Sequence, residues 1–211
     1  MKPEKPPLFI NRDEAAQKLI EKLARYKNCD ACVLSISRGG IALAGHVARA
    51  LRADLFFVPT EVLMHPGDPI RVLGVVSPEH VTMGELDRDI PQEFIYRRTR
   101  TLQTRLAVKY RNVYSSIGSG FRDRVVILIE DCVETPEKIL ACVDIIRRQQ
   151  PDKIVIATPI VSTHVVHDLI TEVDSVIFLN MFSDKNIRSA CSDLEPISDD
   201  DIARLMEMET V

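Results

Sequence analysis

The stretch that decides the fold runs from residue 124 to residue 137 and reads Arg-Val-Val-Ile-Leu-Ile-Glu-Asp-Cys-Val-Glu-Thr-Pro-Glu. Its apolar run, 125–129, shows no alternation of apolar and polar side chains. Strands that are buried on both faces have this pattern, and they occur in parallel sheets covered by helices. Glu130 and Asp131 follow at the carboxyl end of the predicted strand, where open α/β sheets bind their ligands. The stretch therefore predicts a buried strand, an acidic site and a following helix.

The rest of the chain alternates predicted strands and helices around this stretch. The further strands are expected at 32–36, 55–58, 154–157 and 175–179, and the further helices at 11–26, 41–51, 91–114, 162–171 and 199–208. Such alternation predicts an α/β fold with a doubly wound, mostly parallel five-stranded sheet and right-handed crossovers. Residues 72–76 and 80–83 read as two short strands of a small antiparallel excursion. We expect a flexible N-terminal arm, 1–8, and one domain over 9–211.

Two motifs carry a resemblance to a known family. Residues 125–135 resemble the signature of the type I phosphoribosyltransferases for phosphoribosyl pyrophosphate (PRPP), and Ser37-Arg38-Gly39-Gly40, which follows the strand at 32–36, resembles their pyrophosphate loop. The resemblance extends loosely from about Phe9 to about Ile202. It implies a phosphoribosyl transfer between PRPP, which binds with Mg²⁺, and a base or amine acceptor.

The resemblance also implies roles for individual residues. Glu130 and Asp131 would be the catalytic acids and accept hydrogen bonds from the two ribose hydroxyls. Ser37, Arg38, Gly39 and Gly40 would wrap the pyrophosphate. The remaining substrate-binding candidates are Arg97, Arg98, Arg100, Thr135 and Lys138.

The chain departs from the family in the loop for the 5'-phosphate. Relatives continue after the acid pair to a Thr-Gly-x-Thr or Thr-Gly-x-Ser turn, whereas this chain reads Thr135-Pro136-Glu137-Lys138. With Thr135 at the N-cap and Pro136 at the first helical position, this segment predicts a helix start that caps itself and needs no ligand. Glu137 places a negative charge where the phosphate would bind, while Lys138 is able either to neutralise Glu137 or to reach the phosphate. The sequence therefore predicts a degenerate PRPP loop.

Each motif also has a plain structural interpretation. The acid pair is able to cap a helix, Arg38-Gly39-Gly40 is able to form an ordinary turn, and the arginines at 97–105 are as typical of a solvated helix face as of an anion clamp. Two functions therefore stay open: a phosphoribosyltransferase with altered or lost activity, and a non-catalytic protein that binds a nucleotide or another phosphorylated ligand in the same crevice.

The composition and charge of the chain bear on its location in the cell and on its partners. The 211 residues are 45% hydrophobic, carry a net charge of −4 and contain no apolar run that approaches the roughly 18 residues of a membrane span. We expect a cytoplasmic protein that does not bind a membrane and, by the habit of the family, a homodimer. Nucleic acid is an unlikely partner because the net charge is negative and aromatic residues are sparse. Five scattered cysteines favour reduced thiols over a disulfide framework.

Overall fold

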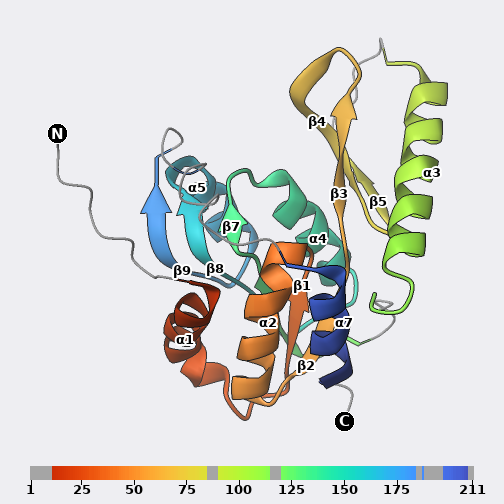
Figure 1. Ribbon diagram of the computed structural model, residues 1–211. Coiled ribbons are helices and arrows are strands. Elements are labelled where there is room, and N and C mark those ends of the chain that lie inside the picture. The colour runs from red at the N-terminus through yellow and green to blue at the C-terminus, as the bar shows by residue number, and fades with distance from the viewer. Residues whose placement is uncertain (1–10, 85–89, 115–119, 184–186, 188–196, 209–211) are drawn as a thin grey trace, which may run out of the picture.

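The computed structural model describes residues 11–84, 90–114, 120–183, 187 and 197–208, without the side chains of residues 69 and 70. A parallel sheet forms its centre (Figure 1). Spatially, β2 (Asp54–Phe57), β1 (Ala31–Ser35), β6 (Val125–Ile129), β8 (Lys153–Ser162) and β9 (Ser175–Phe182) lie side by side. The five predicted strands are thus confirmed, and so is the adjacency of β1, β6 and β8. The predicted arm at 1–8 and Cys191 lie outside the described residues.

The sequence analysis missed one short strand. β7 (Cys132–Val133) pairs in parallel with β8 just beyond β6, so the structure has a sixth strand in this sheet. Because β7 has only two residues, no period of apolar side chains marks it in the sequence.

Helices cover both faces of the sheet, as the unbroken apolar strands predict. Alternate residues of β1 and β6, such as Val33 and Ile127, pack with α1 (Arg12–Leu23), α2 (Arg38–Leu51) and α7 (Asp199–Met208). The intervening residues, such as Leu34 and Val126, pack with α4 (Glu137–Arg147) and α5 (Thr163–Glu172). Every residue of β6 is buried. The strand is therefore apolar throughout because it has no solvent-facing side.

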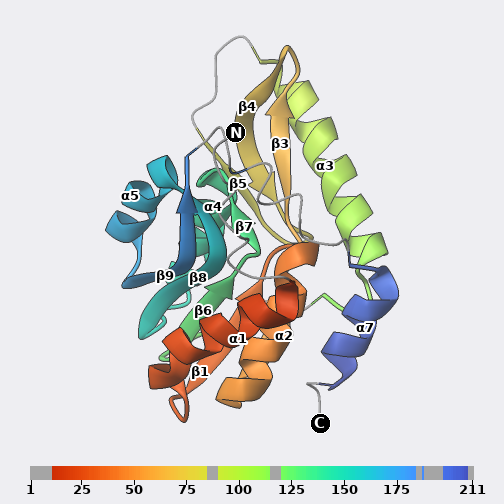
Figure 2. The same ribbon diagram turned by 60° about the vertical axis from the view of Figure 1, so that its left-hand side comes forward.

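A second, antiparallel sheet stands beside the first. It contains β3 (Glu61–His65), β4 (Asp68–Val76) and β5 (Val81–Met83) in that order. The predicted excursion is confirmed, although β3 was not predicted. α3 (Gln92–Lys109) packs Leu102 against this sheet and lies along it in both views (Figures 1 and 2). The helix that carries the predicted arginines therefore packs on the excursion through Leu102, and near its C-terminal end it reaches the core of the central sheet through Leu106.

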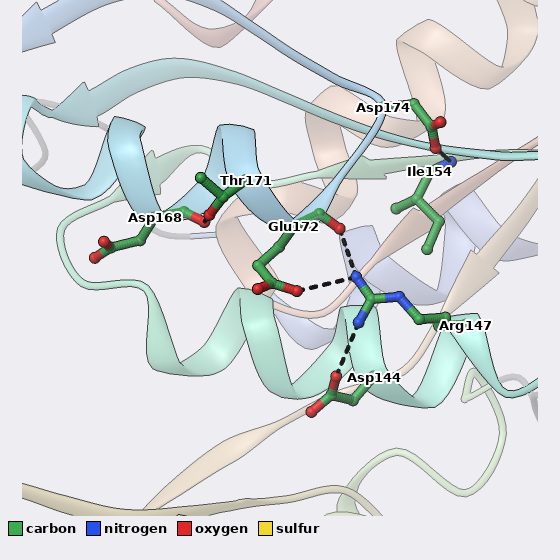
Figure 3. A network of polar contacts seen from close by, with 7 residues as sticks. All are labelled: Asp144, Arg147, Ile154, Asp168, Thr171, Glu172 and Asp174. Carbon is green, nitrogen blue, oxygen red and sulfur yellow. Dashed lines mark hydrogen bonds and ion pairs between the residues drawn. The ribbon is translucent and has the colours of Figure 1, made fainter.

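Polar contacts hold the amino-terminal edge of the central sheet together. Arg147, near the end of α4, donates to the carbonyl of Glu172 at 2.6 Å and pairs with its carboxylate at 3.1 Å, which ties α4 to α5 (Figure 3). Asp174 accepts from the backbone N–H of Ile154 at 2.8 Å. An open hollow beside Arg147 and Lys153 lies at this edge, opposite to the acid pair. Since Arg147, Glu172 and Asp174 of its lining serve these structural contacts, we assign it no ligand.

The cysteines differ in state. Cys29, Cys32 and Cys142 are free thiols, as expected, whereas Cys132 is disulfide-bonded, so the prediction of reduced thiols is wrong at this residue. Burial raises the pKa of Cys142 to about 12, and this thiol stays protonated at neutral pH.

Candidate functional site

The acids Glu130 and Asp131 lie between two segments that both pair with β8. β6 ends at Ile129, opposite Ala157, and pairing resumes at Cys132, opposite Ile160. The backbone N–H of Glu130 also donates to the carbonyl of Ala157 at 3.2 Å. The backbone on both sides of the acid pair is therefore held by β8.

The predicted pyrophosphate loop is the first turn of α2. Helix α2 begins at Arg38, three residues before the predicted start at Ile41, and Ser37 is its N-cap. The hydroxyl of Ser37 accepts from the backbone N–H of Gly40 at 3.0 Å and donates to the Glu130 carboxylate. One side chain thus caps a helix and contacts the catalytic candidate. The structure brings the two motifs together at one edge of the sheet, 93 residues apart in the chain.

Gly39 and Gly40 permit this close approach. A Cβ atom on Gly39 would lie 1.6 Å from Oδ2 of Asp131, and one on Gly40 would lie 2.7 Å from the carbonyl oxygen of Ile129. Neither position has room for a side chain, because α2 starts directly against the acid pair. The need for these two glycines is thus steric and does not come from an unusual φ angle.

The predicted self-capping of α4 is wrong. Pro136, rather than Thr135, is the N-cap of this helix, and no side chain forms a capping hydrogen bond there. Thr135 is exposed. Glu137 is the first helical residue, so its charge still lies at the helix N-terminus. Because the order Thr-Pro-Glu fits a self-capped start in sequence, only the backbone geometry reveals that the helix begins one residue later.

Lys138 pairs with Glu130, an alternative that the sequence analysis did not consider. Its ammonium group lies 3.1 Å from Oε1 of Glu130, whose side chain is 4% exposed. Burial raises the pKa of Glu130, while Lys138 and the Ser37 hydroxyl act against that rise. Burial also acts to lower the pKa of Lys138, but the carboxylate of Glu130 outweighs it and raises that pKa. The two charges therefore stabilise each other in a site that excludes most water.

Arg38 reaches the C-terminal helix. Its guanidinium pairs with the carboxylate of Asp199 at 2.7 Å and donates to the carbonyl of Ile197. α7 is held in place by Ile202, which is fully buried in the core, and by Leu205, which contacts Gly45 of α2. The cation that was predicted to hold pyrophosphate is thus already paired with an acid of the same chain.

Arg12 is a site residue that the sequence analysis missed. It is the first residue of α1, and its guanidinium pairs with Oδ2 of Asp131 at 3.0 Å. Asn11 caps this helix, because its side chain accepts from the backbone N–H of Glu14 at 3.0 Å. Nothing in the local sequence distinguishes Arg12 from other helix-start arginines, since its partner is 119 residues away.

The structure does not bring the arginines of α3 to the acid pair. Arg97, Arg98 and Arg100 are exposed, and Arg97 pairs with Glu93 one turn earlier at 3.3 Å. The helix that carries them lies along the antiparallel sheet rather than beside β1 and β6 (Figure 2). The solvated helix face is therefore the interpretation that the geometry favours.

Comparisons with known proteins agree with this geometry. The chain matches the model of the family described as "Phosphoribosyl transferase domain" over residues 4–180. The crystal structure of TT1426 from Thermus thermophilus is similar with a TM-score of 0.79 and 26% identity, and the match covers 96% of this chain and 99% of that one.

Two curated Mycobacterium tuberculosis sequences, "Putative phosphoribosyl transferase Rv0571c" and "Putative phosphoribosyl transferase MT0597", are each 25% identical over 181 residues. The match covers 82% of this chain and 40% of each relative, so the chain spans less than half of their length. Among the helices that the structure describes, none combines the length and the apolar character that a bilayer span requires. With a family model matched over most of its length and both family motifs joined at one edge of its sheet, the chain belongs to the phosphoribosyl transferase domain family.

Proposed function

We propose that this protein binds PRPP and transfers its phosphoribosyl group to a base or amine acceptor. The observation that carries the proposal is the contact between the Ser37 hydroxyl and the Glu130 carboxylate, which joins the predicted pyrophosphate and ribose motifs. PRPP carries its pyrophosphate on carbon 1 of the ribose, next to the 2-hydroxyl, so it needs both motifs within one molecule's reach. Their meeting at the carboxyl edge of a parallel sheet supports such a ligand.

The residues would act mainly by position and charge. Glu130 and Asp131 accept hydrogen bonds from the ribose hydroxyls, and Arg38 with the first turn of α2 holds the pyrophosphate leaving group. Bond breaking develops positive charge on the sugar, which two nearby carboxylates stabilise. Lys138, in the first turn of α4, lies where the 5'-phosphate would bind and supplies the charge that the altered loop lacks.

Mg²⁺ would enter the site with PRPP. In the described ranges, no three His, Cys, Asp or Glu side chains gather as a metal site, and both acids already have cationic partners. These residues fit a metal ion that the pyrophosphate and ribose oxygens of the ligand hold, rather than one held by the protein alone.

A second candidate function is non-catalytic binding of a ribosyl phosphate. The contacts of Glu130 favour it, because both oxygens of this buried carboxylate already accept from Lys138 and Ser37, and a ribose hydroxyl must compete for the remaining lone pairs. A protein whose acid stays paired would bind the phosphate groups without activating the sugar. Its crevice would then serve to sense the ligand.

Calorimetric titration with Mg²⁺ and PRPP tests ligand binding, which both functions require. We expect binding, and its absence with PRPP, ribose 5-phosphate and pyrophosphate alike would refute both. The two functions are separated by an assay for release of pyrophosphate from PRPP, monitored by phosphorus NMR in the presence of a panel of bases and amines. Turnover that Glu130→Gln abolishes supports the transferase, whereas binding without any turnover supports the sensor.

Removing Asp199 should strengthen the binding of inorganic pyrophosphate. Asp199→Asn removes the acid partner of Arg38, and because this pair is largely exposed we expect a gain of about 1.4-fold to fivefold in affinity, the range for an exposed ion pair. Asp200→Asn is the matched control, since it removes the same charge from the same helical turn. Equal gains in both variants would show that general repulsion, rather than competition for Arg38, limits the affinity.

A further inference from the structure

The charged side chains around the acid pair form ion pairs that join different parts of the chain. Arg12 of α1 pairs with Asp131, Lys138 of α4 pairs with Glu130, and Arg38 of α2 pairs with Asp199 of α7. The family motifs include both acids and Arg38, and Lys138 follows the second motif by three residues, but the N-terminal helix lies far from them in the sequence. Arg12 therefore adds a positive charge to the crevice that neither motif provides.

The position of Arg12 is determined by the packing of its helix. Ala15, Ala16, Leu19 and Leu23 are fully buried, and α1 packs against α2, β8 and β9. Asn11 caps the helix immediately before Arg12. The guanidinium is thus presented to Asp131 from a well-packed helix, and both side chains of the pair are mostly buried, with 13% of Arg12 and 19% of Asp131 exposed.

The contact involves the carboxylate oxygen of Asp131 that faces the first turn of α2. Oδ2 of Asp131 accepts from Arg12 and is also the atom closest to a Cβ placed on Gly39. The carboxylate therefore lies between the guanidinium and the first turn of α2. A ligand whose pyrophosphate binds at that turn has a ribose hydroxyl close to Asp131. The carboxylate accepts a hydrogen bond from this hydroxyl only if it is held in a defined orientation.

We infer that Arg12 is a positioning residue that orients Asp131 toward a ribose hydroxyl and so makes the site selective for sugar phosphates with both vicinal hydroxyls. This inference rests on the proposed function. Arginine suits the task because its planar group fixes the orientation of a carboxylate, whereas lysine offers only a point charge. The positive charge also balances Asp131, so that an anionic sugar phosphate is not repelled.

The test compares affinities for ribose 5-phosphate with those for its 2-deoxy and 3-deoxy analogues. All three carry the same charge, so their ratios cancel general electrostatic effects of a substitution. In Arg12→Gln we expect ribose 5-phosphate to bind about tenfold more weakly, the loss for a misaligned hydrogen bond to a charged group, while at least one analogue changes less. Arg12→Lys should retain part of the selectivity, and thermal melts establish that each variant is folded.

Arg25→Gln is the matched control. Arg25 follows the other end of α1, where it donates to the hydroxyl of Ser175 on the surface, and its loss should leave every ratio unchanged. If the wild type discriminates against a deoxy analogue and Arg12→Gln keeps that discrimination, the inference is overturned and Arg12 only ties α1 to the sheet. If the wild type binds no ribose 5-phosphate, or does not discriminate, the proposed role of the acid pair fails and the inference fails with it.

Discussion

Replacing Lys138 with alanine should lower the free energy of unfolding by about 3 kcal/mol at neutral pH, the lower end of the range for a broken buried ion pair. The reason is the carboxylate of Glu130, which is 4% exposed and would remain without its ammonium partner. We place the effect at the lower end because the Lys138 side chain is itself 30% exposed. Urea unfolding measured at about pH 8 would give the value.

The loss should shrink as the pH falls. Burial raises the pKa of Glu130 above its ordinary value of 4.5, and in the variant Lys138 no longer opposes this rise. Glu130 of the native variant then binds a proton more tightly than Glu130 of the unfolded chain. The stability that this protonation provides is therefore fully present below pH 4.5, and it is lost as the pH rises through the native pKa of Glu130. A deficit equally large at about pH 5 and about pH 8 would contradict this account.

Two further variants isolate the pair. Lys138→Ala combined with Glu130→Gln should be more stable than Lys138→Ala alone at about pH 8, because no buried charge is left unpaired. Lys153→Ala is the control for loss of a lysine, since Lys153 is 54% exposed and pairs only loosely with its neighbour Asp152 at 3.8 Å. We expect the control to change stability by less than about 0.5 kcal/mol.

Gly39→Ala should weaken PRPP binding by about tenfold to a hundredfold, the range for a lost hydrogen bond to a charged group. The new Cβ would lie 1.6 Å from Oδ2 of Asp131, so the carboxylate must turn away from both Arg12 and the ligand. The end of a side chain yields easily, so we expect stability to fall by only about 1 kcal/mol. Calorimetry and urea unfolding measure the two effects separately.

Gly40→Ala should show a larger loss of stability. Its Cβ would lie 2.7 Å from the Ile129 carbonyl oxygen, a backbone atom that cannot rotate away. We therefore expect a loss of about 2 to 3 kcal/mol for forcing an extra carbon into a packed contact. Gly67→Ala is the control, because a Cβ there meets only ordinary contacts with His65 at 3.6 Å. If all three variants behave alike, the close approach of α2 to the acid pair is not what requires glycine.

The central sheet was predictable because burial on two faces leaves a strong mark on a sequence. Val125–Ile129 could only be a fully covered strand, and the acids after it could only lie at the edge where parallel strands end. The start of α7 at Asp199 was also predicted correctly. These features depend on neighbours in the chain, so the local sequence is enough to specify them.

The pairing within the crevice was not predictable in the same way. Lys138 is eight positions after Glu130, and its partner depends on where α4 begins, which the Thr135-Pro136 order suggested one residue too early. Asp131 meets Arg12, and Arg38 meets Asp199, only because α1 and α7 fold over the same sheet edge. The sequence left the role of the α3 arginines open, since their density says nothing about which sheet the helix joins.

The pairing of β8 with both β6 and β7 lowers the entropy that the acid pair loses when a ligand binds. The backbone of Glu130 and Asp131 is held before and after by hydrogen bonds to one strand, so these residues lose little conformational freedom when a ligand arrives. The loss of conformational entropy on binding must instead arise mainly in the ligand and in side chains that exchange ion-pair partners. A sugar phosphate of fixed ring geometry should therefore be favoured over an open-chain polyol phosphate that offers the same hydroxyl groups.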